Sequence, residues 1–309
     1  MITQRTSAGV GRSLVAPGAR RHPRRQAPGA LATVRAVRRS ARLTVAVLVI
    51  LAFVCPIYLT VVNAFKTDAA IAASPESLPV HPTLRNLSAA LTQPGHVLEI
   101  GLRNSLIVVV CSVALLIPLG SAFSFWVSRK RSRPRAAIMA AFAVGLMIPP
   151  QITVLPIIKI LSALGLDHTY PGLILSNIGG GYLSFAVFVY VGFMRSIPAE
   201  IIEAARIDGA SGLRIWWTII MPVVRPATAT VGIFLSLWIW NDFLNPLLII
   251  GPITGQTVTV GLYDAVSNQV QPDYGLQFGF MFLAALIPVA GYLLVQKQFR
   301  AGLTAGSTR

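Results

Sequence analysis

Residues 196–222 read SIPAEIIEAARIDGASGLRIWWTIIMP and lie between two long apolar runs. The stretch cannot lie in membrane hydrocarbon, because it holds five charged side chains: Glu200, Glu203, Arg206, Asp208 and Arg214. It nevertheless has the signals of two helices. Ser196 suits the start of the first helix and Gly209 its end. Ser211 suits the start of the second helix, which Pro222 limits. We therefore predict a short helical hairpin held at a membrane surface.

One face of the predicted first helix carries little side-chain bulk. On a period of 3.6 residues, Ile201, Ala205 and Gly209 share this face, and Ala204 lies beside it. A partner surface can approach a helix backbone closely where the side chains are this small. The hairpin is therefore expected to be a docking element as well as a connection between two apolar runs.

The composition is that of an integral membrane protein. Of the 309 residues, 54 % are hydrophobic and 12 % are charged, whereas an ordinary soluble domain is about 25 % charged. The net charge of +16 does not indicate nucleic-acid binding, because much of it is concentrated in residues 1–42. These hold ten of the 26 Lys and Arg residues and no Asp or Glu. They have no apolar period and are predicted to be a disordered basic tail.

Six apolar runs reach the roughly 20 residues that a membrane span needs. The chain is thus predicted to be an all-α integral membrane protein with six transmembrane helices. The first helix, 43–65, follows the tail, and the other five form one domain, 100–296, which includes the hairpin; residues 297–309 are a C-terminal tail. The six predicted spans are 43–65, 104–128, 136–158, 168–194, 226–250 and 274–296.

The distribution of positive charge between the spans predicts the orientation of the chain. Counted from the N-terminus, alternate segments hold 22 Lys and Arg residues, and the segments between them hold four. Cytoplasmic segments carry such an excess. Both termini and the hairpin are therefore predicted to be cytoplasmic. The basic segments are 1–42, 129–135, 195–225 and 297–309, and the others are 66–103, 159–167 and 251–273.

The chain lacks the sequence patterns of an enzyme or of a nucleotide-binding protein. It has four histidines, of which three lie in the tail or in a predicted outer loop and His168 begins the fourth predicted span, and they form no cluster of metal ligands with cysteines and acidic residues. It contains no Gly-rich phosphate loop with its Lys, and no Gly-x-Ser-x-Gly motif. Cys55 and Cys111 both lie in apolar runs and indicate no disulfide framework. We expect no cofactor, no metal and no catalysis in this chain.

Asp242 is the only acidic residue within a predicted span. An ionisable residue in such a place is often functional. With Trp238 one turn earlier and the neighbouring Asn241, it can offer hydrogen bonds and a stacking face to a polar solute on a substrate pathway. It also lies near the outer end of its run, where an acid can simply cap or pair at a helix end. The residues leave both interpretations open.

The hairpin resembles a known signature. Its pattern E-A-A-x3-G-x9-I-x-M-P, from Glu203 to Pro222, is similar to the EAA motif of inner-membrane permease subunits of ABC importers, and departs from it only at Met221, where that motif has Leu. Further stretches resemble the second, six-helix permease of the maltose-type carbohydrate uptake family, and the likeness covers 43–306. These stretches are 63–68, 103–106, 148–151, 164–170, 240–243 and 302–306.

This resemblance implies a type I ABC importer permease in the bacterial cell membrane. Such a subunit forms the path of a carbohydrate with a second permease. An extracytoplasmic solute-binding protein delivers the solute, and an ATPase dimer that binds ATP and Mg²⁺ supplies the energy. The hairpin would be the coupling helix that docks on the ATPase, with Glu203 and Arg206 able to pair with each other. The coupling residues that the motif implies are Glu203, Ala204, Ala205, Arg206, Asp208, Gly209 and Pro222.

Two further expectations concern the outer side and the alternatives. By its position, loop 251–273 is expected to contact the binding protein through Gly255 and Gln256. The solute can instead be a glycerol phosphate or an oligopeptide. The hairpin and the basic tail also suggest, less well, a membrane-anchored helix-turn-helix regulator, but residues 212–220 hold a single Arg among apolar side chains, which is unfavourable for reading a DNA groove.

Overall fold

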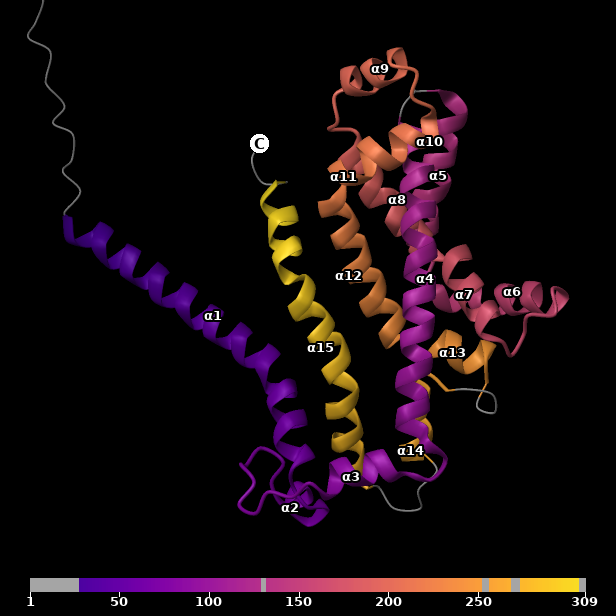
Figure 1. The fold of residues 1–309 in the computed structure, drawn as a ribbon. Coiled ribbons are helices and arrows are strands. Elements are labelled where there is room, and N and C mark those ends of the chain that lie inside the picture. Colours follow the sequence, from indigo (N-terminus) through magenta and orange to yellow (C-terminus); the bar gives the residue numbers. More distant parts are fainter. Residues whose placement is uncertain (1–27, 129–131, 252–255, 268–272, 306–309) are drawn as a thin grey trace, which may run out of the picture. The chain divides into compact units, whose positions relative to one another are not determined.

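The computed structural model describes residues 28–305 except 129–131, 252–255 and 268–272, and every regular element in the described part is helical (Figure 1). The elements are α1 (Pro28–Ala64), α2 (Asp68–Ala73), α3 (Arg85–Thr92), η1 (Pro94–His96), α4 (Val97–Ser128), α5 (Arg133–Met147), α6 (Pro150–Ala163), α7 (Tyr170–Gly179), α8 (Gly181–Met194), α9 (Ala199–Ile207), α10 (Gly212–Ile215), η2 (Trp216–Ile220), α11 (Met221–Val223), α12 (Arg225–Asn241), α13 (Leu244–Ile249), α14 (Val258–Ser267) and α15 (Tyr274–Ala305).

Two terminal helices are longer than the predicted spans. α1 begins at Pro28, within the predicted disordered tail, and α15 continues to Ala305, beyond the predicted end at 296. The residues that extend α1 are rich in Ala and Arg, which favour helix over coil. The predicted disorder of 1–42 is thus wrong for 28–42, and residues 1–27 lie outside the described part.

The chain divides into two units, Met1–Cys55 and Pro56–Arg309. The division falls within α1, so the first part of this helix belongs to one unit and its last turns to the other. In the first unit the described side chains of α1 are exposed, including Leu43, Leu48 and Phe53. Such an apolar and exposed helical surface is suited to lipid. Pro56 lies at the division and removes one backbone donor from the helix.

Three single helices and three bent helix pairs are long and apolar enough to cross a membrane, but the third pair joins residues 212–223 of the hairpin to α12 and so differs from the predicted fifth span. The three single helices are Arg38–Ala64, Pro94–Ser128 and Tyr274–Leu294. Two of the bends coincide with helix breakers: the third apolar run bends by 108° before Pro150, and the fourth by 45° at Gly180. By length and composition, the described residues therefore contain three helices able to cross a membrane, or up to six if each bent pair is one span.

The predicted fifth span, 226–250, is not one helix. α12 ends at Asn241, and the separate short helix α13 follows. Pro246 lacks a backbone donor, and the Asp242 carboxylate accepts hydrogen bonds from Asn245 that begin a new turn. At its other end α12 meets the hairpin at a bend of 79°.

Within the second unit, α4 is the helix against which the others pack. It runs from the end that holds α3 and α14, called here the loop end, to the end that holds α9 and α10, called here the hairpin end (Figure 1). α8 approaches α4 closely, because a Cβ at Gly120 would lie 2.8 Å from the Ala186 Cβ. The Ser124 hydroxyl also donates to the Val187 carbonyl at 3.2 Å. Small residues commonly allow membrane helices to pack in this way.

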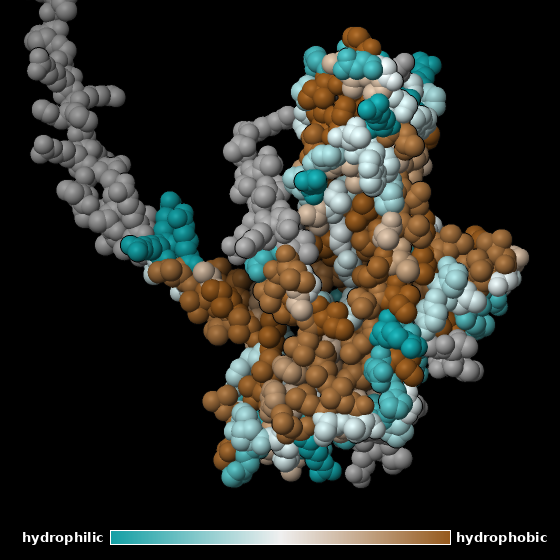
Figure 2. Space-filling view, in the orientation of Figure 1, coloured by the Kyte–Doolittle hydropathy of each residue, from teal (hydrophilic) through white to brown (hydrophobic). Residues whose placement is uncertain are grey.

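The surface of the second unit agrees with a membrane location. Figure 2 shows apolar side chains over most of its middle, with hydrophilic residues toward the hairpin end and the loop end. A face of this kind suits the hydrocarbon core between two polar interfaces.

At the loop end, Lys66 is almost completely buried at 1 % exposure. Its ammonium donates to the carbonyl of Ser74 at 2.9 Å, the carbonyl of Pro75 at 3.3 Å and the hydroxyl of Ser77 at 3.2 Å. The side chain therefore closes the segment that connects α2 to α3.

We expect Lys66→Met to loosen this segment without unfolding the chain. The change removes three hydrogen bonds from a charged donor, and such bonds are worth about 1.5–3 kcal/mol each. Limited proteolysis of the purified protein should show faster cutting between residues 67 and 84. The exposed Lys159 provides a matched control. Equal cutting of Lys66→Met and Lys159→Met would contradict the prediction.

Candidate functional site

The hairpin forms at one end of the second unit and has most of the predicted helix signals. α9 ends at Ile207 with Asp208 as its C-cap, and Gly209 adopts a positive φ of 80°, which a glycine accepts readily. Ser211 caps the second helix by accepting from the Arg214 backbone N–H at 3.3 Å. Ser196, however, does not cap α9. Its hydroxyl donates to the Phe193 carbonyl, so it belongs to the preceding turn.

The second half of the hairpin contains a π-helical turn. α10, the π turn η2 and α11 follow one another without a break up to Val223, so Pro222 lies in the last turn. Trp216 opens the π turn and is buried, and its indole N–H has no hydrogen-bond partner in the described part of the chain. π turns are often found at functional positions in helices.

The predicted small face of α9 divides between the chain's own core and its surface. Ala205 is buried together with Ile202, so its methyl group packs inside the chain. The expectation that Ala205 shares a free face with Gly209 is therefore wrong, because Ala205 and Ile202 belong to the buried apolar core of the chain. Ala204 and Gly209 are exposed, and no atom lies within 4 Å of a Cβ built on Gly209.

Large apolar side chains are exposed around this small face. Ile207 is 86 % exposed, Leu213 72 % and Trp217 63 %. Exposed large side chains of this kind are typical of surfaces that a partner covers. The prediction from the sequence did not include them, because it placed the docking face at the small residues Ala204, Ala205 and Gly209.

The charged residues of the hairpin do not pair as expected. Glu203, Arg206 and Asp208 are all exposed, and in the described part of the chain no ion pair within 4.0 Å joins Glu203 to Arg206. The three side chains therefore project from the hairpin end, where a partner protein can reach them.

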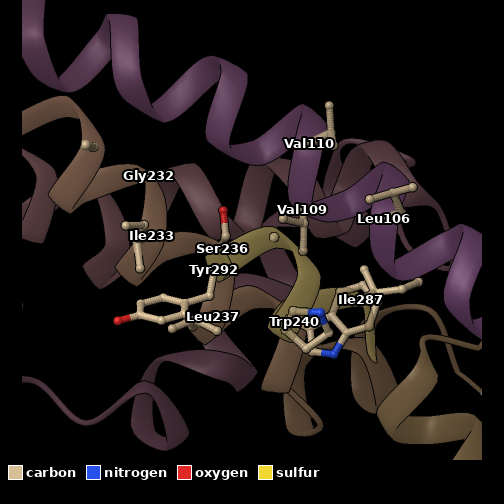
Figure 3. A pocket seen from close by; sticks show the side chains of 13 residues that line it. Leu106, Val109, Val110, Gly232, Ile233, Ser236, Leu237, Trp240, Ile287 and Tyr292 are labelled. Carbon is tan, nitrogen blue, oxygen red and sulfur yellow. The ribbon is translucent and has the colours of Figure 1, made fainter. Parts of the chain in front are cut away.

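The two long faces of α12 differ in character. One face borders a cavity of about 380 Å³ between α4, α12 and α15, and the side chains around it are mostly apolar (Figure 3). Of the side chains that line the cavity, those of Ser236, Trp240 and Tyr292 carry hydrogen-bonding groups. The predicted pathway residues Trp238, Asn241 and Asp242 do not line this cavity.

Trp238 instead belongs to an aromatic cluster on the other face of α12. Its ring stacks on Tyr182 at 6.2 Å between centroids and meets Phe185 edge-on at 4.7 Å. Phe234 lies one turn away at 5.8 Å. Trp238 remains 43 % exposed, and Asn241 is exposed nearby. Sequence reasoning missed Tyr182 and Phe185, because aromatic residues in an apolar run carry no signal of which helix they will meet.

The Asp242 side chain forms hydrogen bonds within the turn that leads from α12 into α13. Its carboxylate accepts from the backbone N–H of Asn245 at 3.3 Å and from the Asn245 amide at 2.7 Å. Its backbone carbonyl accepts from the Thr259 hydroxyl at 2.7 Å. Of the two interpretations left open, this geometry favours the helix-capping role.

Of the two residues predicted to contact a binding protein, Gly255 lies outside the described residues. Gln256 is described, and its side-chain amide donates to the Asp264 carboxylate. Its backbone carbonyl accepts from the Asn104 amide at 3.1 Å. Gln256 is therefore bound to its own chain at both places.

Comparison with known proteins gives consistent results. Residues 116–299 match the family model described as binding-protein-dependent transport system inner membrane component. The chain is 31 % identical to the probable starch degradation products transport system permease protein AmyC of Thermoanaerobacterium thermosulfurigenes, over 84 % of this chain and 93 % of that protein. It is 32 % identical to the diacetylchitobiose uptake system permease protein NgcG of Streptomyces coelicolor, over 88 % and 90 %.

The fold is also shared with a solved structure. A chain in the crystal structure of a bacterial ABC transporter that imports the acidic polysaccharide alginate superposes with a TM-score of 0.71. The match covers 86 % of this chain and 98 % of that one, at 20 % sequence identity. The helical arrangement is thus one already known among ABC importers.

Proposed function

Because this chain belongs to the family of binding-protein-dependent transport system inner membrane components, we propose that it is the permease subunit of an ATP-driven carbohydrate importer. It forms the translocation pathway with a second permease. An extracytoplasmic binding protein delivers the sugar, and an ATPase dimer in the cytoplasm binds ATP and Mg²⁺. The chain itself is a non-catalytic membrane subunit. The observation that carries the proposal is the exposed EAA hairpin at one end of a membrane-spanning bundle.

Carbohydrate is favoured as the solute by two considerations. The relatives named above transport starch degradation products and diacetylchitobiose. The aromatic cluster with Tyr182 and Trp238 presents flat apolar rings next to the Asn241 amide, a combination suited to a sugar ring with its hydroxyl groups. A sugar phosphate would call instead for Arg or Lys beside the pathway.

The hairpin is proposed to dock on the ATPase through its exposed residues. Ala204 and Gly209 allow close approach, and Ile207, Leu213 and Trp217 supply apolar contact around them. Glu203, Arg206 and Asp208 face solvent and supply charges for pairing. Ala205 and Pro222 belong to the proposed site as residues that shape the hairpin. A helix-turn-helix regulator is disfavoured, because Ile215, Trp216 and Ile220 of the second half are buried in the chain.

Six spans with both termini in the cytoplasm remain the proposed topology. It is supported by the excess of Lys and Arg in the segments on the side of the hairpin. The loop end then faces the outer side, where the binding protein approaches. The connection that contains Gly255 and Gln256 is proposed to take part in that contact.

Reconstitution tests this proposal directly. The chain would be purified with its neighbouring permease and ATPase and placed in proteoliposomes with the binding protein encoded beside it. ATP-dependent uptake of a sugar to which that binding protein responds is the expected result. Uptake of glycerol phosphate or of an oligopeptide instead would show that the family assignment holds but that the substrate class is wrong.

Trp238→Ala is expected to reduce sugar uptake by about five-fold, the effect of losing roughly 1 kcal/mol of ring contact. Uptake in the reconstituted system measures this, and recovery of the assembled complex should not change. Trp126→Ala is the matched control, since Trp126 is similarly exposed at 49 % but lies on α4 away from the cluster. Equal uptake by the two variants would exclude Trp238 from the pathway.

A further inference from the structure

At the loop end, α4 holds the segment that leads into α14. This segment, residues 256–258, is called here the loop stem. The Asn104 amide donates to the Gln256 carbonyl at 3.1 Å, and the Ser105 hydroxyl accepts from the Val258 N–H at 2.9 Å. Asn104 is 3 % exposed and Ser105 is 2 % exposed, so neither bond competes with water.

The two backbones also approach closely at this point. A Cβ built on Gly101 would lie 3.0 Å from the Val258 Cα. Only a glycine places α4 near enough for the short side chains one turn later to reach the main chain of the loop stem. The attachment therefore depends on Gly101, Asn104 and Ser105 together.

The loop stem and its surroundings are fixed from other directions as well. The Gln256 side chain donates to Asp264 of α14. The Thr259 hydroxyl donates to the Asp242 carbonyl, where α12 ends. On the preceding side, the His168 backbone N–H donates to the Ile249 carbonyl at 2.9 Å. The main chain on both sides of residues 252–255 is thus tied to separate parts of the second unit.

We propose that Asn104 and Ser105 are positioning residues through which the engagement of the binding protein acts on the membrane helices. The proposal rests on the proposed function. In this proposal Gln256 belongs to the loop stem and holds it in place, because its backbone carbonyl and its side-chain amide are both hydrogen-bonded within the chain. We assign the transmission of this effect to α4. Its first turns carry Asn104 and Ser105, and further along it packs on α8 and on the π turn of the hairpin.

The attachment itself can be tested without the binding protein. Thr257 lies between the two bonds and is 4 % exposed. In a chain with Cys55→Ala and Cys111→Ala, Thr257→Cys should react slowly with a maleimide when the complex is in nanodiscs. Adding Asn104→Ala and Ser105→Ala should speed this labelling roughly ten-fold, since two buried hydrogen bonds no longer oppose opening. Unchanged labelling would overturn the assignment of Asn104 and Ser105.

The functional consequence is read from ATPase activity of the whole complex. Asn104→Ala with Ser105→Ala should raise the concentration of sugar-loaded binding protein needed for half-maximal stimulation by about ten-fold. Basal ATPase activity and the maximal stimulated rate should stay within about two-fold of the wild type. Ser124→Ala is the matched control, because Ser124 is also buried on α4 and bonds a backbone carbonyl, but toward α8.

The outcomes separate the inference from the proposed function. A wild-type half-saturating concentration in the double variant would overturn the inference. So would a fall in maximal rate shared with Ser124→Ala and with no change in half-saturation, because that pattern indicates packing alone. A wild-type complex that no binding protein stimulates would instead refute the proposed function, and the labelling result would still report on the attachment.

Discussion

Gly209→Asp is expected to leave the chain in the membrane while it abolishes both recovery of the ATPase and sugar uptake. Among the described residues, no atom lies within 4 Å of a Cβ at this position, so the new side chain has room in the chain itself and acts on a partner surface. The positive φ of 80° adds a local strain of about 1 kcal/mol. A buried, unpaired carboxylate at a close protein interface costs several kcal/mol, so ATPase binding should weaken about 100-fold or more.

The measurement is co-purification of the ATPase with the tagged chain, followed by uptake in proteoliposomes. Gly165→Asp is a matched control in the connection between α6 and α7, outside the hairpin. Gly165 has a φ of 68° and likewise no atom within 4 Å of a Cβ, so the local strain is the same. The control should retain its ATPase. If Gly209→Asp also retains it and transports normally, the hairpin is not the coupling element.

Gly279→Val is expected to destabilise the second unit more than any other glycine substitution on α15. A Cβ at Gly279 would lie 2.6 Å from the Asn86 carbonyl oxygen and 2.8 Å from its carbon. These are backbone atoms of α3 and cannot rotate away. Asn86 in turn donates to the carbonyls of Lys66 at 2.6 Å and Ala64 at 3.1 Å, which closes the end of α1.

The larger side chain forces α3 and α15 apart at a cost of about 1–3 kcal/mol, with further loss if the Asn86 bonds break. The thermal unfolding midpoint of the purified chain should therefore fall by roughly 5 °C. Gly291→Val is the control, because it lies on the same helix with no atom within 4 Å of its Cβ. A midpoint equal to that of the control would show that α3 can move at no cost.

Much of the architecture could be predicted without the structure. Apolar runs located the membrane helices, because a span needs a minimum apolar length whatever its neighbours. Two breaks in these helices coincide with residues that disfavour a helix interior, Pro149 with Pro150 and Gly180. The break after Asn241 is harder to predict, since nothing in the run from 226 to 250 shows that the Asp242 carboxylate bonds to Asn245 rather than to a solute.

The candidate site was harder to predict, and the reason lies in helix faces. A periodicity of 3.6 residues groups Ala205 with Gly209, but it does not say which side of α9 packs on the rest of the chain. The structure buries Ala205 and exposes Ile207. In the same way, Trp238 and Trp240 are two positions apart, yet one joins the aromatic cluster and the other lines the cavity.

By itself, then, the sequence determined a helical membrane protein with a charged hairpin of EAA type and an excess of positive charge on one side. These properties follow from local composition and spacing, which act within a helix or across one interface. Only the tertiary structure decided which hairpin residues face a partner and which side of α12 carries the aromatic cluster. It alone brought Asn104 and Ser105 onto the loop stem, about 150 residues later in the chain. Contacts of that separation depend on how helices pack, and packing is a property of the whole bundle.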